Sequence, residues 1–187
     1  MRTKLTSLLF SILAVAAFGI SQAFAQGFQL PNMQVTTDAF EPGGVIPIRY
    51  TSHGDNIQPG FTITGAPEIT ASFAIIFHDI EVALVPGTGD VTHWLAWNIT
   101  AREIPEGSLP AGSVQGNNIR GQANYMGSGA PRADPERYHH YVFEFYALND
   151  TLDLPEGASR DDLVAAMQGK VVGKAAYVGR YANAQAQ

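Results

Sequence analysis

The order of hydrophobic and polar residues predicts a mainly β protein. Residues 72–79 are almost continuously apolar, which indicates a central strand buried on both faces. Further strands are predicted over residues 45–51, 61–64, 91–99, 139–148 and 171–181. Pro47 argues that the first of these lies at an edge or forms a bulge, because proline has no N–H to give to a sheet.

Alternation along two of the predicted strands indicates which side chains share a face. In the earlier strand it places His93 on the same side as Leu95 and Trp97. In the later strand it sends the neighbours His139 and His140 to opposite sides. Only one of these two histidines should therefore face a given pocket.

One helix is predicted, near residues 159–168. Ser159 is followed three residues later by Asp162, which resembles the capping box of a helix start. The apolar positions that follow have helical spacing, and Gly169 is a natural C-terminal stop. The segments between elements are turns or irregular, including the glycine-rich stretch 125–132, and no repeat or linker divides the chain.

The start of the chain, residues 1–25, has the pattern of a cleavable signal peptide. A basic start precedes an apolar run over residues 8–20, and an Ala-Phe-Ala motif ending at Ala25 supplies the small residues that a signal peptidase reads. The run is short for a transmembrane helix, so an uncleaved anchor is the less favoured alternative. We expect cleavage after Ala25, a single domain over residues 26–187, and a periplasmic or secreted protein.

Composition excludes several classes of function. The signal peptide holds two of the 11 basic residues and none of the 17 acidic ones, which leaves nine basic residues and a formal charge of −8. A chain this acidic lacks the clustered lysine and arginine that nucleic acids require. The chain has no cysteine, so disulfides, thiol catalysis and cysteine-ligated metals are excluded. A single anionic ligand in a specific pocket is not excluded.

The candidate chemistry centres on histidine and carboxylate side chains. His93, His139, Asp79 and Glu81 could converge as metal ligands or acid–base groups, but their spacing matches no metal signature. Ser128 stands in Gly-Ser-Gly without the strand-to-helix context of a nucleophile elbow. A hydrolase or metal enzyme is therefore an alternative that no motif supports.

An anion pocket accounts better for the same residues. The N–H groups of the glycine-rich loop can point at one anion, and imidazole and tyrosine side chains add donors. Asp79 would fix the tautomer of His93 and raise its basicity. Such a pocket needs no lysine or arginine. His53 lies in a predicted turn, and we expect it to be solvated.

Five short motifs, in the right order, resemble the phosphatidylethanolamine-binding protein family, particularly its bacterial Raf-kinase-inhibitor-like branch. Residues 43–52 are similar to its GG-x-IP-x-x-Y-T segment, and residues 77–82 stand where it has Asp-Pro-Asp-x-Pro. The strand that contains His93 resembles its histidine-containing strand. Residues 125–131 and 139–143 resemble its Gly-x-Gly-Pro-Pro loop and its His-Arg-Tyr-x-Phe strand. The resemblance covers nearly the whole chain after the signal peptide.

The resemblance implies a large central antiparallel sheet, a smaller flanking sheet and a small anion-binding pocket. By position, the ligand-binding residues would be Asp79, Glu81, His93, Gly129, Pro131, His139 and Tyr141. His139, rather than His140, would be the inward residue. Three single positions depart from the family pattern, since Glu81 replaces the second aspartate, Ala130 the first loop proline and His140 the arginine. Residues 58–61, Gln-Pro-Gly-Phe, also stand where the family has Ser-Pro-Pro-Leu.

The function that the resemblance implies is non-catalytic binding of a phosphate-type anion or a phospholipid head group, with no cofactor or metal. Inhibition of a protease or kinase through the pocket-side surface is one alternative. A hydrolase or metal enzyme that uses the same histidines and aspartate is another. We expect neither nucleic acid as a partner nor a stable membrane span. A homodimer and an inhibited protein partner stay open.

Overall fold

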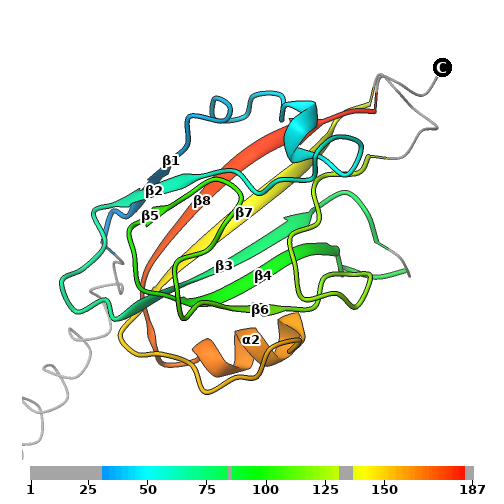
Figure 1. The fold of residues 1–187 in the computed structure, drawn as a ribbon. Coiled ribbons are helices and arrows are strands. Elements are labelled where there is room, and N and C mark those ends of the chain that lie inside the picture. Colours follow the sequence, from blue (N-terminus) through cyan, green and yellow to red (C-terminus); the bar gives the residue numbers. More distant parts are fainter. Residues whose placement is uncertain (1–30, 84–85, 131–136, 184–187) are drawn as a thin grey trace, which may run out of the picture. The chain divides into compact units, whose positions relative to one another are not determined.

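The computed structural model describes residues 31–83, 86–130 and 137–183 (Figure 1). The chain from residue 31 onward forms one compact unit. The predicted signal peptide and Pro131 lie outside the described residues. Within the described residues, no helix has the length and apolar character needed to cross a membrane.

A five-stranded antiparallel sheet forms the centre of the domain. In spatial order its strands are β6 (Val114–Gly116), β4 (Val91–Ile99), β3 (Ser72–Asp79), β7 (His139–Leu148) and β8 (Val171–Tyr181). Every residue of β3 is buried, which confirms the central strand predicted from its apolar run. The predicted strand boundaries of β4, β7 and β8 also agree with the structure.

Two smaller layers cover the large sheet, one on each face (Figure 1). On one face lies a three-stranded sheet of β1 (Gln34–Thr36), β2 (Phe61–Thr64) and β5 (Glu103–Ile104). On the other lies α2 (Arg160–Met167), whose Leu163 and Met167 pack among buried residues of β3 and β4. The structure thus confirms a mainly β fold with a large central sheet, a smaller flanking sheet and one late helix.

The helix begins as its sequence predicts. The Ser159 side chain accepts a hydrogen bond from the N–H of Asp162, and the Asp162 side chain accepts one from the N–H of Ser159. This reciprocal capping box satisfies N–H groups that would have no partner at a helix start. Gly169, two residues after the helix, has a φ of 76°, a left-handed conformation that favours glycine.

The prediction of a strand over residues 45–51 is wrong. Residues Ile48–Tyr50 form a short 3-10 helix, η1, and only Val45 and Thr51 make isolated bridges to other segments. The N–H of Tyr50 donates to the carbonyl of Pro47 at 2.9 Å, which closes a turn where a strand would continue. Apolar and β-branched residues surround Pro47, but their local preference for a strand is overridden by this turn.

A β-bulge in β4 changes the direction of His93. The β3–β4 register pairs Phe77 with Trp94 and His78 with Thr92, so His93 is an extra residue without a partner on β3. Its ring lies 5.3 Å from the rings of both Phe77 and Tyr141, on the side of the small sheet. Alternation placed His93 with Leu95 and Trp97, which in fact pack toward α2. That prediction was wrong because a bulge shifts the alternation by one residue.

Candidate functional site

Residues from two strands and three loops surround a pocket of about 290 Å³ at the end of β3 and the start of β4. The pocket lining comprises Ser52, His53, Asp79, Val82, Val91, His93, Ile119, Arg120, Met126, Gly127 and Gly129. Three of the residues carried over from the family pattern, Asp79, His93 and Gly129, are in this lining. Ser52, His53 and Arg120 were not predicted.

A hydrogen-bonded unit of Asp79 and its neighbours forms beside the pocket. Nδ1 of His139 lies 2.8 Å from Oδ2 of Asp79, and the N–H of Glu81 donates to Oδ1 of Asp79 at 3.0 Å. Tyr141, two residues after His139, contacts the glycine-rich loop, because its hydroxyl accepts a hydrogen bond from the N–H of Gly129 at 3.3 Å. Burial, followed by the charge of Asp79, raises the pKa of the Tyr141 hydroxyl, which therefore stays protonated.

The glycine-rich loop, and not Asp79, holds His93 in place. Nδ1 of His93 lies 3.1 Å from the carbonyl oxygens of both Met126 and Gly127. Burial lowers the pKa of His93, and this outweighs the opposing effects of the loop carbonyls and of the Asp79 charge. The expectation that Asp79 fixes the tautomer of His93 was wrong, because Asp79 makes that bond with His139 instead.

The loop is joined to the turn over residues 51–56, so the two form one wall of the pocket. Oδ1 of Asn56 accepts from the N–H of Gly127 at 2.7 Å, and the N–H of Ser52 donates to the carbonyl of Ser128 at 3.0 Å. Loop N–H groups are thus occupied by acceptors within the protein. The expected nest of loop N–H groups around an anion is therefore not seen at three loop residues. The N–H of Met126 donates to the carbonyl of His93, that of Gly127 to Oδ1 of Asn56, and that of Gly129 to the Tyr141 hydroxyl.

Glu81 is absent from the pocket lining and pairs with His140. Oε1 of Glu81 lies 2.7 Å from Nδ1 of His140, and Oε2 accepts from the backbone N–H of the same residue. Two of the three positions that depart from the family pattern therefore contact each other. His139 is buried and His140 is exposed, so they face opposite sides as alternation predicted, and His139 is the inward one as the family resemblance implied.

Arg120 and His53 give the pocket polar groups that sequence reasoning missed. Both are exposed residues that line the pocket, from separate loops. Nδ1 of His53 lies 3.2 Å from the Tyr181 hydroxyl, and its Nε2 lies 3.2 Å from Nδ2 of Asn183. The end of β8 therefore orients His53, which is not merely solvated. No local pattern around Arg120 signals its position; the pocket was expected to need no arginine, but one lies in its lining.

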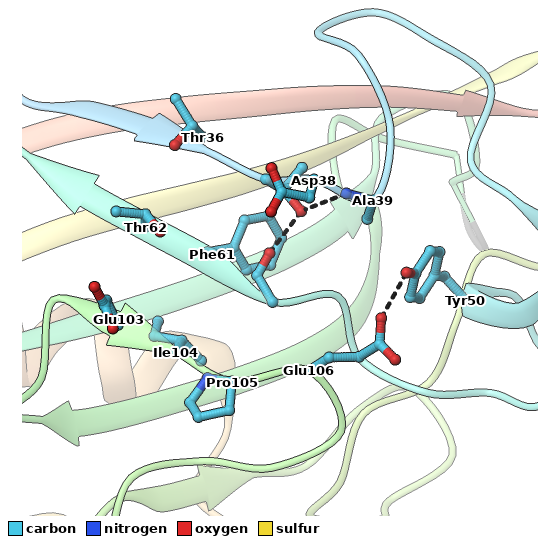
Figure 2. A pocket seen from close by; sticks show the side chains of 12 residues that line it. Thr36, Asp38, Ala39, Tyr50, Phe61, Thr62, Glu103, Ile104, Pro105 and Glu106 are labelled. Atoms are coloured by element: carbon cyan, nitrogen blue, oxygen red, sulfur yellow. Dashed lines mark hydrogen bonds between the residues drawn. The ribbon is translucent and has the colours of Figure 1, made fainter.

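A larger hollow of about 530 Å³ lies over the small sheet (Figure 2). Its ionisable groups are mostly acidic, and they include Asp38, Glu103 and Glu106. The hydroxyl of Tyr50 donates to Oε2 of Glu106 at 2.6 Å, and Arg49 donates to Oε1 of the same carboxylate at 2.6 Å. Of the seven predicted ligand residues, none of the six that the structure describes lines this hollow. Its carboxylates would repel an anion, so the smaller pocket is the candidate site.

Asp79, Glu81 and His139 bring one ligand atom each to within 4.8 Å of one another, which is a spacing that could hold a metal ion. All three residues already have hydrogen-bond partners, however, because Asp79 bonds directly to His139 and Glu81 to His140. Ser128 is completely buried and is absent from the pocket lining, so it offers no accessible nucleophile. The geometry suits binding better than catalysis.

The comparisons with known proteins agree on one family. The family model for phosphatidylethanolamine-binding protein matches residues 36–182. A UPF0098 protein from Methanothermobacter thermautotrophicus is 38% identical over 156 residues, which covers 80% of this chain and 98% of that protein. A UPF0098 protein from Pyrococcus abyssi is 36% identical over 158 residues, covering 80% of this chain and 85% of that protein.

Two solved structures share the fold and belong to the same group of proteins. A phosphatidylethanolamine-binding protein homologue from Chlamydia trachomatis has a TM-score of 0.72 and 31% identity, over 80% of this chain and 96% of that one. YbcL from E. coli, a member of the mammalian phosphatidylethanolamine-binding protein family, has a TM-score of 0.72 and 26% identity, over 80% of this chain and 98% of that one. This chain belongs to the phosphatidylethanolamine-binding protein family.

Proposed function

We propose that this protein binds a phosphate-type anion, free or as the head group of a phospholipid, in the pocket that His93 and Arg120 line, and that it does so without catalysis. The observation that carries the proposal is the concave site itself. It combines Arg120, His93, the neighbouring Ser52 and His53, and the carboxylate of Asp79 with apolar side chains and glycines. Arg120 supplies the positive charge, while the Asp79 carboxylate is already hydrogen-bonded to His139 and to the N–H of Glu81.

Pocket size supports a small ligand. About 290 Å³ is at the low end for small-molecule sites, which suits a phosphate or head group rather than a whole lipid. The name of the family and of its solved relative, phosphatidylethanolamine-binding protein, describes those proteins and agrees with a phospholipid head group. Exposed Ile119 and the nearby exposed Ile80 give the mouth an apolar edge, along which the rest of a larger ligand can lie.

Thermal melting in the presence of anions tests the proposal. Inorganic phosphate or O-phosphorylethanolamine, at about 100 times its Kd, should raise the Tm by roughly 5–10 °C for a domain of this size. The double variant His93→Ala with His139→Ala should abolish the shift, whereas His140→Ala, an exposed neighbour outside the lining, should keep it. If no phosphate compound moves the Tm of the unmodified protein, anion binding loses its support.

Turnover measurements separate binding from catalysis. A hydrolase or metal enzyme would hydrolyse generic phosphate and carboxylate esters or contain stoichiometric metal. We expect no turnover above the rate of the His93→Ala variant. A metal content near one per chain, lost on replacing Asp79, would instead favour a metal site at Asp79, Glu81 and His139.

We also propose that the protein is exported after cleavage at Ala25. The family model begins at residue 36, downstream of that position. The intact mass of protein recovered from a periplasmic fraction tests this, because the mature chain should begin at Gln26. Recovery of the uncut chain in the membrane fraction would favour an anchor.

A further inference from the structure

The face of the large sheet that carries α2 holds a group of polar residues apart from the candidate pocket. Asp79, the last residue of β3, lines the pocket, and His78 before it points to the opposite face of the sheet. Ala74 and Ile76, which share that face with His78, pack toward α2. His78 is only 6% exposed and is absent from the pocket lining. It therefore takes no part in the proposed anion site.

Asp90 fixes both the orientation and the tautomer of His78. Nδ1 of His78 lies 2.5 Å from Oδ2 of Asp90. An ionised carboxylate only accepts hydrogen bonds, so Nδ1 carries a proton, and the lone pair of the neutral imidazole is on Nε2. Oδ1 of Asp90 accepts a hydrogen bond from Arg160 at the start of α2. The carboxylate behind the ring is thus held from two sides.

Nε2 of His78 is buried, and it has no hydrogen-bond partner among the described residues. A carboxylate oxygen, Oε2 of Glu144, lies 3.9 Å away, which is too far for a hydrogen bond. The hydroxyl of Tyr146 donates to this oxygen at 2.9 Å and holds the carboxylate beside the ring. Two acceptor atoms therefore lie close together without a donor between them, and a buried polar atom in this state points to a bound ion or water.

The two acceptors belong to neighbouring strands rather than to loops. The register of β3 and β7 places Val142 opposite His78 and Glu144 opposite Ile76. His78 and Glu144 are thus diagonal neighbours on one face of the sheet. The side chain of Glu144 is 29% exposed, so the site opens to solvent on its side.

We propose that His78 and Glu144 bind a divalent transition-metal ion of the zinc class, through Nε2 of His78 and a carboxylate oxygen of Glu144. This inference goes beyond the proposed anion binding and does not depend on it. Imidazole and carboxylate are ligands that zinc and its neighbours accept, and water from the open side completes the coordination. Metal-binding histidines commonly donate their other ring N–H to a carboxylate, which is the role of Asp90 here.

The distance between the two ligand atoms suits one ion. A zinc–nitrogen and a zinc–oxygen bond together measure about 4.1 Å, so an ion reaches both atoms across the 3.9 Å that separates them. A small rotation of the partly exposed Glu144 side chain brings the wide angle at the ion closer to a tetrahedral one. Among the described residues Glu144 forms no salt bridge with a lysine or arginine, which leaves its charge for a cation.

This site differs from the group of Asp79, Glu81 and His139, whose spacing could also hold an ion. There the carboxylates bond directly to Nδ1 of a histidine, Asp79 to that of His139 and Glu81 to that of its neighbour on β7. At His78 the carboxylate bond instead leaves Nε2, a ligand atom, facing a second carboxylate. The two groups make different predictions, because different histidines are required.

Isothermal titration of the metal-free mature protein with zinc chloride at neutral pH tests the proposal. We expect one Zn²⁺ per chain. Asp90→Asn, which acts only through the ring, should weaken the affinity roughly 10–100-fold, and His78→Gln should weaken it further. Asp161→Asn, at an exposed carboxylate beside Arg160, should keep the affinity, and so should His139→Gln. Because the ion joins β3 to β7, zinc should raise the Tm of the unmodified protein but not that of His78→Gln.

NMR of the unmodified protein with ¹⁵N-labelled histidine locates the ion even if a variant does not fold. Zinc should shift the Nε2 signal of His78 and leave its Nδ1 protonated. If zinc binds without changing the His78 signals, or if His139→Gln removes binding, the ion lies at Asp79, Glu81 and His139 and the inference is wrong. If the protein takes up no zinc, water alone serves Nε2, and the inference fails while anion binding is unaffected.

Discussion

Nδ1 of His139 lies 2.8 Å from Oδ2 of Asp79, which joins the first residue of β7 to the last residue of β3. The strand register pairs Asp79 with Tyr141, so this bond reaches past the directly opposite residue. Both side chains are buried at the point where the two strands enter the pocket. The pair therefore holds the strand ends together as well as placing a carboxylate beside the ligand.

Replacing Asp79 by asparagine should destabilise the domain. The amide keeps the shape of the side chain, but it loses the charge that His139 and the N–H of Glu81 bond to. We expect the free energy of unfolding in urea to fall by about 1–3 kcal/mol, the range for a buried polar group that loses its partner. Asp38→Asn, at an exposed carboxylate, should change it by less than about 0.5 kcal/mol. Equal effects of the two variants would contradict a structural role for the Asp79–His139 pair.

Glu81→Gln should have a small effect that depends on pH. Burial alone would raise the pKa of Glu81, but hydrogen bonds from the side chain and backbone of His140 lower it below its ordinary value of 4.5. Because the folded pKa is lowered, the stabilisation is present at pH well above 4.5 and is lost as pH falls through the folded value. The difference in unfolding free energy between the two proteins should be at most about 1 kcal/mol at neutral pH, since the pair is partly exposed.

Urea titrations between pH 3 and pH 7 measure that difference. The gap between unmodified protein and Glu81→Gln should close as the pH falls below 4.5. Glu156→Gln, at an exposed glutamate, should show no such convergence. A gap that widens on acidification would mean that folding raises the pKa of Glu81, which is the opposite of the effect expected from its bonds to His140.

Asn56 should stabilise the domain through both its backbone conformation and its side-chain hydrogen bond. Its φ is 56°, in the left-handed region that asparagine and aspartate tolerate better than alanine does, and its Oδ1 accepts the N–H of Gly127. Asn56→Ala should lower the unfolding free energy by about 1–2 kcal/mol, whereas Asn56→Asp should retain most of it. Asn56→Gly, which keeps only the backbone freedom, should fall between the two. Equal stability of all three variants would show that the turn does not hold the glycine-rich loop.

Local signals in the sequence were sufficient for most of the fold. The apolar run of β3 predicted a central strand, and the reciprocal Ser159–Asp162 cap predicted the start of α2. In both cases the information lies within a few consecutive residues. Alternation also sent His139 and His140 to opposite sides correctly, because β7 has a regular register with β8 at that end, while the family resemblance identified His139 as the inward one.

The candidate site was less predictable, because its geometry depends on long-range contacts. A one-residue bulge turned His93 to the opposite face, and such a bulge has no signal in the alternation itself. Arg120 reaches the pocket from an irregular loop, and His53 is oriented by Tyr181 at the far end of the chain. The glycine-rich loop was correctly placed beside the histidines, but the loop groups that face His93 are carbonyls and not N–H groups.

Gly127 should be intolerant of even one methyl group. A Cβ added there would lie 2.6 Å from the backbone carbon of Thr51, and it would also meet the carbonyl oxygen of Tyr50. Backbone atoms cannot move aside as a flexible side chain can, so Gly127→Ala would push the loop from the turn and displace the carbonyl that bonds to His93. We expect the unfolding free energy in urea to fall by about 1–3 kcal/mol, the usual cost of overpacking. Gly87→Ala is the matched control, since a Cβ there has no neighbour within 4 Å. If Gly127→Ala were as stable as Gly87→Ala and bound phosphate equally well, close packing of the loop against the turn would not be what positions His93.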